Sequence, residues 1–259
     1  MKVKNIYITL NDVVRSVENT FIKQYESYLE DIKESFEYEV VDSHETGIHK
    51  NASFDLTNLP LHHDPQLHEI NEKALIIPHE PKSFSGVSVP DQQNIIRSKE
   101  KFSFETIEDF NNFVFHDRAF DIFGRADELY KNAINDLNEL IVRLINANTE
   151  LDENDKSKIL KTVNVSILSL ERDTSKPATL FFLSKYKFLG GNIKFVYDYS
   201  QVWEIADLII TANPYIINTR KNRKKVYKIN TDYNSSSKAT KSFDNIYELI
   251  QNKETLKIF

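Results

Sequence analysis

The sequence contains no cysteine and only five glycines among its 259 residues. The absence of cysteine excludes disulfides, thiolate nucleophiles, and zinc or iron-sulfur sites built on cysteine ligands. With so few glycines, the glycine-rich loops that bind phosphate in nucleotide-binding folds are excluded by inspection. Any chemistry of this chain must therefore come from other residue types.

The chain also lacks a long apolar run and an excess of positive charge. No stretch of about 18 apolar residues is present, which is the length that a membrane-spanning helix needs. The formal net charge is -6, which argues against a general nucleic-acid coat. The first residues, MKVKN, precede a strand pattern and are typical of neither a signal peptide nor a transit peptide. We therefore expect a cytoplasmic protein without membrane contact.

The most informative stretch is Asn5 to Arg15, NIYITLNDVVR. Its apolar residues predict a buried strand, and the polar residues Thr9, Asn11 and Asp12 mark the end of that strand. In open α/β sheets, ligands bind beyond the carboxyl ends of the strands, so residues 9 to 12 form a candidate site. Apolar residues then recur at three-to-four spacing from Val13 onward, which predicts an amphipathic helix over residues 13–36.

Strand and helix patterns alternate through the second half of the chain. Further strands are predicted at 163–168, 192–196, 206–214 (ADLIITANP) and 226–229. Helices are predicted at 106–123, 127–148, from Lys176 and Pro177 onward, around Trp203, and at 242–251. This alternation is typical of a three-layer α/β fold with a parallel sheet and helices on both faces.

The pattern breaks down between residues 42 and 101, where five of the seven prolines lie. Short strands are expected at 38–41, 74–77 and 84–89. Because a long structureless loop is unusual inside a compact domain, we interpret this segment as an irregular insertion that packs on something else.

The residues YITLNDVV resemble the first motif of the haloacid dehalogenase superfamily of phosphohydrolases, in which an apolar strand ends in Asp-x-Asp. The resemblance implies that the first Asp attacks phosphorus and binds magnesium, and that the second is the general acid and base. This sequence has Thr9 and Asn11 at those positions. The resemblance also implies a Rossmannoid core formed by residues 1–15 and 116–259, with an inserted cap-like region at 16–115.

Later segments resemble the remaining motifs of that superfamily. Ser169 ends the second strand, where the resemblance implies a hydroxyl that holds a phosphoryl oxygen. The third motif is a lysine that stabilises the charged intermediate. Lys176 is the first candidate for it and Lys185 the second. The fourth motif usually ends in two acids that complete a magnesium site, but Thr211 and Ala212 stand there. Ser169 and Lys176 therefore remain as candidate phosphate-binding residues.

The four positions that should carry acids supply no negative charge. Magnesium prefers carboxylates with water and phosphate, and an unactivated threonine is a poor nucleophile. Our hypothesis is a catalytically inactive dehalogenase-like domain, a pseudoenzyme without a cofactor or metal, that serves as a structural or interaction protein. Its expected partners are other proteins in a larger assembly.

Composition and motifs are also similar to those of dehalogenase-like proteins of tailed phages that resemble 5'-deoxyribonucleotidases. If the chain is phage-encoded, a virion component near the head-to-tail connection is the corresponding placement. One alternative is a nucleotide phosphatase of that kind, with a rearranged site that uses magnesium. Another is a non-catalytic sensor of phosphate or nucleotide.

Three further clusters have two interpretations each. Histidines 62, 63 and 68 could bind a metal, but polar loop residues are the commoner explanation. Phenylalanines between 110 and 123 indicate a core, or else a partner surface. A basic run could contact nucleic-acid phosphates or an acidic partner, although a solvated loop is favoured. That run comprises Arg220, Lys221, Arg223, Lys224, Lys225 and Lys228.

Overall fold

The first predicted strand lies in the middle of a parallel sheet. A computed structural model of the chain describes residues 2–17, 20–31, 107–155, 159–169, 171–196, 202–221 and 223–258. Within these residues, seven strands form one sheet in the order β4-β5-β1-β7-β8-β9, with β6 also paired to β5. The strands are β1 (Lys2–Thr9), β4 (Glu150–Leu151), β5 (Ile159–Ser169), β6 (Ile193–Phe195), β7 (Leu208–Thr211), β8 (Lys225–Ile229) and β9 (Lys241–Phe243). Only the β4–β5 pair is antiparallel among them.

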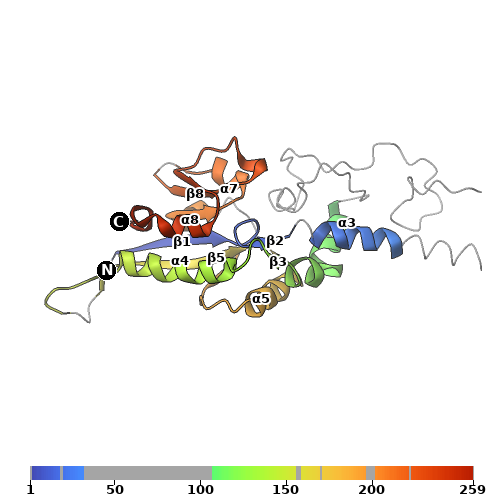
Figure 1. Cartoon of the computed structure of the whole chain (residues 1–259), viewed down its shortest axis with the longest axis horizontal. Coiled ribbons are helices and arrows are strands. Elements are labelled where there is room, and N and C mark those ends of the chain that lie inside the picture. Colours follow the sequence, from blue (N-terminus) through green and yellow to red (C-terminus); the bar gives the residue numbers. More distant parts are fainter. Residues whose placement is uncertain are drawn as a thin grey trace, which may run out of the picture.

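Helices cover both faces of this sheet (Figure 1). The helices after the insertion are α4 (Ala133–Asn148), α5 (Ser175–Lys185), α6 (Val202–Ile205), α7 (Pro214–Asn218), α8 (Ile246–Gln251) and α9 (Lys253–Leu256). Successive strand residues point to opposite faces, so Ile6 and Ile8 pack with α4, α5 and α8. Tyr7 and Ile209 face the other way and pack with Trp203 of α6. The predicted three-layer α/β architecture is confirmed.

The helix predicted from Val13 is wrong in its first part. Asp12 adopts a left-handed conformation with φ of 60°, and a tight turn returns the backbone N–H of Arg15 to the carbonyl of Leu10. Strand β2 (Arg15–Ser16) follows and pairs with β3 (Asp127–Glu128), and a helix is formed only at residues 20–31. The apolar spacing predicted a helix here because Val13 and Val14 are buried against the sheet core, but they are buried as part of a turn.

Two other boundaries differ from the prediction. The helix predicted over 127–148 begins only at Ala133, because residues 127 and 128 pair with β2. The helix predicted over 242–251 begins at Ile246, because residues 241–243 pair with β8 as strand β9. Asn245 caps α8 by accepting a hydrogen bond from the backbone N–H of Glu248 at 2.9 Å, which fixes where that helix starts.

A second group of helices lies beside the sheet, at the end of the molecule away from both termini (Figure 1). It consists of residues 20–31, α3 (Ile107–Asn112), and the π-helices η3 (Phe113–Asp117) and η4 (Phe120–Gly124), and we call it the helical unit. Its core is a cluster of its own, in which the rings of Phe21 and Phe113 meet edge to face at 5.9 Å. The phenylalanines are therefore mainly core, although Phe120 remains 44% exposed.

Several predicted features lie outside the described residues, including the short strands at 38–41, 74–77 and 84–89 and the histidines at 62, 63 and 68. Among the described residues, no helix is both long enough and apolar enough to cross a membrane.

Candidate functional site

The motif residues meet at the carboxyl edge of the sheet. β5, β1 and β7 are adjacent and parallel, so their last residues, Ser169, Thr9 and Thr211, lie at the same edge. All three residues are buried. This edge is the site that the sequence predicted from the end of the first strand.

Thr9 and Thr211 bind each other directly. The hydroxyl of Thr9 donates a hydrogen bond to the hydroxyl of Thr211, with 2.9 Å between the two oxygens. The Thr211 oxygen also accepts from the backbone N–H of Asn213 at 3.0 Å. A hydroxyl pair of this kind is neutral at every physiological pH, and it joins two strand ends at which the resemblance implies carboxylates.

The next positions at the end of β7 are held by amide side chains. The Nδ2 atom of the buried Asn234 donates to the backbone oxygens of Ala212 and Ile229, at 2.8 Å each. Asn213 accepts from the backbone N–H groups of Tyr215 and Ile216 and so caps α7. Ala212 packs its methyl group into the sheet core. These contacts fix the backbone of the segment that resembles the fourth motif.

Asn11 faces a guanidinium group. The Nε and Nη2 atoms of Arg15 donate to Oδ1 of Asn11 at 2.9 and 2.6 Å. Arg15 is completely buried, with Phe123 and Phe182 each 5.2 Å from its guanidinium carbon, measured to the ring centroid. At the second motif position, the side-chain oxygen of Asn11 therefore accepts hydrogen bonds from a residue inside the protein.

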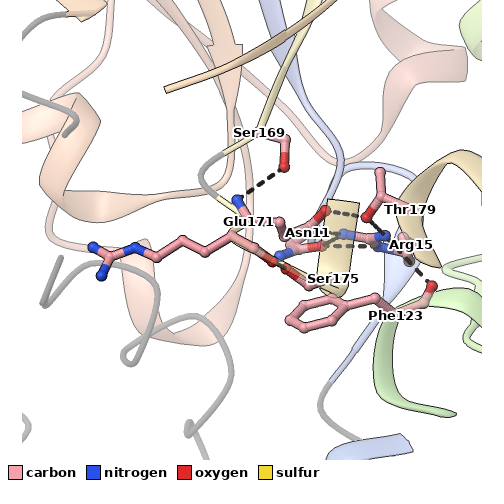
Figure 2. A network of polar contacts seen from close by, with 8 residues as sticks. Asn11, Arg15, Phe123, Ser169, Glu171, Ser175 and Thr179 are labelled. Carbon is pink, nitrogen blue, oxygen red and sulfur yellow. Dashed lines mark hydrogen bonds and ion pairs between the residues drawn. The ribbon is translucent and has the colours of Figure 1, made fainter. Parts of the chain in front are cut away.

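A buried ion pair completes this network (Figure 2). Arg15 pairs with Glu171, whose other carboxylate oxygen accepts a hydrogen bond from the hydroxyl of Thr179. Arg15 also donates to Thr179 at 2.7 Å, and the backbone N–H of Glu171 donates to Ser169 Oγ at 3.2 Å. A charge removed from water is tolerated only when it is paired and hydrogen-bonded, as here.

Arg15, Glu171 and Thr179 were not identified from the sequence as site residues. The available signal was that Arg15 and Glu171, of opposite charge, each follow closely after a buried strand that belongs to the site. Spacing alone could not pair them, because 156 positions separate the two residues.

Asp12 is the one carboxylate of the first motif. It is 1% exposed, and its Oδ2 atom accepts a hydrogen bond from the hydroxyl of Tyr233 at 3.2 Å. Tyr233 belongs to η6 (Asp232–Asn234), which follows β8. The left-handed turn thus directs this carboxylate toward η6.

The remaining motif residues lie on either side of the β5–α5 connection. Ser169 ends β5, and Lys176 is in the first turn of α5, which Pro177 helps to start as predicted. The Nζ atom of Lys176 lies 5.9 Å from the ring centroid of Phe195, at the end of β6. Phosphate binding by Ser169 and Lys176 stays a prediction. The reserve residue, Lys185, lies at the last turn of α5.

The basic run is largely bound within the protein. Lys221 pairs with Glu204 at 3.3 Å, and Lys224 pairs with Asp207 at 3.4 Å. Lys228 is buried, and its Nζ atom donates to backbone oxygens of the segment after β8. Arg220 donates to the hydroxyl of Thr240 at 2.8 Å. Contact of Arg220, Lys221, Arg223, Lys224 and Lys225 with a nucleic acid or an acidic partner stays a prediction, and a solvated loop stays the favoured interpretation.

The residues at the carboxyl edge do not fit the magnesium ion that the resemblance implies. Thr9, Asn11, Thr211 and Ala212 are neutral, whereas magnesium requires near-octahedral oxygen ligands that normally include carboxylates. The nearby carboxylates of Asp12 and Glu171 are bound to Tyr233 and Arg15. Across the described ranges, no three His, Asp or Glu side chains are grouped to hold a metal.

Solved structures of two other proteins are similar to this chain. One, from Burkholderia xenovorans LB400, is described as a haloacid dehalogenase-like hydrolase; identity is 10%, the TM-score is 0.49, and 100% of this chain and 99% of that one are covered. The other is a dehalogenase with an intermediate complex, with 9% identity, a TM-score of 0.44 and 96% of each chain covered. No protein-family model matches the sequence, and no sequence among curated proteins does.

The strand order carries the fold assignment by itself. The strand of the first motif lies between β5 and β7, whose ends carry the second and fourth motif segments, and β6 and β8 extend the parallel sheet on either side. The chain therefore has a doubly wound, Rossmannoid three-layer fold, as predicted.

Proposed function

We propose that this chain is a catalytically inactive protein of haloacid dehalogenase-like fold that acts as a structural or interaction protein. The hydrogen bond between Thr9 and Thr211 is the observation that supports this most directly. It occupies two positions at which the resemblance implies a nucleophile and a metal ligand. The strands and helices around it keep a complete apolar core.

Among the described residues, no basic group is hydrogen-bonded to the Thr9 hydroxyl. To attack phosphorus, a threonine must pass its proton to an adjacent base, but this proton is donated to another hydroxyl. A general acid or base contributes about 10² to 10⁴-fold to a rate. Losing that group together with the nucleophile and the metal site should leave no measurable phosphatase activity.

The first test is a hydrolysis assay on the purified full chain. p-Nitrophenyl phosphate and a panel of mononucleotides are supplied with magnesium or manganese, and phosphate release is compared with that of Thr9→Ala and Asp12→Ala variants. We expect the three proteins to be indistinguishable from the buffer blank. Metal-dependent release that either substitution abolishes would support the nucleotide phosphatase instead.

Calorimetric titration with inorganic phosphate and with mononucleotides separates the scaffold from a sensor. The scaffold predicts no binding heat. Binding that is lost in Ser169→Ala or Lys176→Met would support the sensor, because those are the residues matched to phosphate contacts.

As a structural or interaction protein, the chain should bind other proteins. A domain that keeps its core and loses its chemistry can be retained for its surface, because fold and function are separable. The measurement is the native mass of the particle in which the chain occurs in its source, with the stoichiometry of its neighbours. We expect a larger protein assembly, and a virion if the source is a tailed phage; a free monomer would contradict the proposal.

A further inference from the structure

Arg15 lies where the sheet meets the helical unit. It follows the turn after β1 and begins β2, and its side chain is completely buried. The guanidinium carbon lies 5.2 Å from the ring centroid of Phe123, which belongs to η4 of the helical unit. A permanently charged group at this junction must be neutralised by whichever segments surround it.

The partners of Arg15 come from three parts of the chain (Figure 2). Asn11 belongs to the turn after β1, and Glu171 and Thr179 belong to the β5–α5 connection and to α5. The backbone oxygen of Phe123, in η4, accepts from Nη1 at 3.4 Å. One side chain therefore joins the carboxyl edge of the sheet, helix α5 and the helical unit.

The helical unit packs closely on α5 around this network. Thr174, at the start of α5, donates through its hydroxyl to the backbone oxygen of Phe115 in η3. At Gly124, the end of η4, an added Cβ would lie 3.2 Å from the backbone oxygen of Ala178, so the two backbones nearly touch. Moving the helical unit away from α5 would open these contacts and separate Arg15 from part of its surroundings.

We propose that Arg15, Glu171 and Thr179 form a buried polar lock. Through its contact with the backbone oxygen of Phe123, Arg15 holds the helical unit, together with α5, in one fixed position on the sheet. Breaking one member leaves an uncompensated buried charge or an unpaired donor, which is costly in a low-dielectric interior. The lock does not depend on the absence of catalysis, so the two proposals can fail separately.

The test is hydrogen-deuterium exchange on the full chain, read separately for the helical unit and for the sheet. In Thr179→Val, which leaves the ion pair in place but removes both hydrogen bonds of the Thr179 hydroxyl, we expect amides of residues 20–31 and 107–124 to exchange about tenfold faster or more. In Arg15→Gln, which leaves Glu171 buried without its partner, we expect about a hundredfold or more. Amides of β1 and β7 should exchange as in the unmodified chain.

Arg125→Gln is the matched control. Arg125 pairs with Asp121 at 2.7 Å in the same region, but its side chain is 69% exposed, so we expect no change in exchange. Equal acceleration in the sheet and the helical unit would overturn the lock and assign the network to global stability. Unchanged exchange in Thr179→Val would overturn the lock as well. Because Thr179→Val keeps the ion pair, it still provides a test if Arg15→Gln does not fold.

Discussion

At the scale of single residues, position 9 shows how neutral side chains suit the carboxyl edge of this sheet. Thr9 is 7% exposed, and its hydroxyl is bound to the neutral hydroxyl of Thr211. A carboxylate there would lose most of its hydration, and burial raises the pKa of such an acid. This position is therefore suited to a neutral threonine, and its surroundings would have to change to accept an acid.

Thr9→Asp tests this adaptation. We expect the free energy of unfolding at pH 7 to fall by about 2 to 4 kcal/mol, because a charge is buried without a cation that was placed for it. Urea denaturation at pH 7 and pH 4 measures the effect, which should be smaller at pH 4, where the buried acid is protonated. Thr9→Val, the isosteric control, should cost about 1 kcal/mol at both pH values. A Thr9→Asp variant as stable as the unmodified chain at pH 7 would contradict the interpretation.

At the scale of elements, the start of α4 gathers acidic side chains. Glu128 accepts a hydrogen bond from the backbone N–H of Ile134 at 2.8 Å, and Asp136 lies in the first turn of the helix. Burial, together with the nearby Glu139 and Glu128, raises the pKa of Asp136, although the neighbouring Tyr130 hydroxyl acts in the opposite direction. Burial likewise raises the pKa of Tyr130.

Asp136→Asn should stabilise the protein at neutral pH. Because the folded state binds a proton at Asp136 more readily than the unfolded chain, whose Asp pKa is about 3.9, stability falls as the pH rises from there through the raised pKa. Asparagine keeps the size of the side chain but cannot ionise, so it removes this loss of stability. We expect a gain of about 0.5 kcal/mol at pH 7, limited by solvent screening, and no gain below about pH 3.9. Thermal denaturation across this pH range measures the difference; a variant less stable at pH 7 would contradict it.

At the scale of the whole molecule, the described chain has apolar clusters on both faces of the sheet and a separate aromatic cluster in the helical unit. Phe21 and Phe110 are completely buried in the aromatic cluster, and Leu137 of α4 is completely buried under the sheet. Separate cores allow regions of one chain to open with different free energies.

Phe21→Ala and Leu137→Ala should therefore weaken different regions. Removing Phe21 should cost about 3 to 5 kcal/mol and removing Leu137 about 2 to 5 kcal/mol, because each leaves a cavity in a close-packed cluster. In Phe21→Ala we expect hydrogen exchange to accelerate at residues 107–124 before the sheet responds. In Leu137→Ala we expect β1 and β5 to accelerate. Identical exchange patterns in the two variants would show that the clusters unfold as one unit.

Much of the fold could be predicted because it depends on local sequence. Apolar runs identified β1, β5, β6, β7 and β8, and their alternation with helices indicated a parallel sheet. The predictions failed at the turn after β1 and at the start of α4. There, the short strands β2 and β3 pair although their residues are 111 to 113 positions apart, and a local sequence pattern cannot predict such a distant pairing.

The sequence by itself determined which side chains stand at the strand ends, and so that Thr9, Asn11, Thr211 and Ala212 bring no carboxylate to the site. Only the tertiary structure decided what those side chains bind. Thr9 meets Thr211 across 202 positions, and Arg15 meets Glu171 across 156, because neighbouring parallel strands bring their ends to the same edge. The sequence specifies each side chain, whereas the order of strands in the sheet determines which side chain each one contacts.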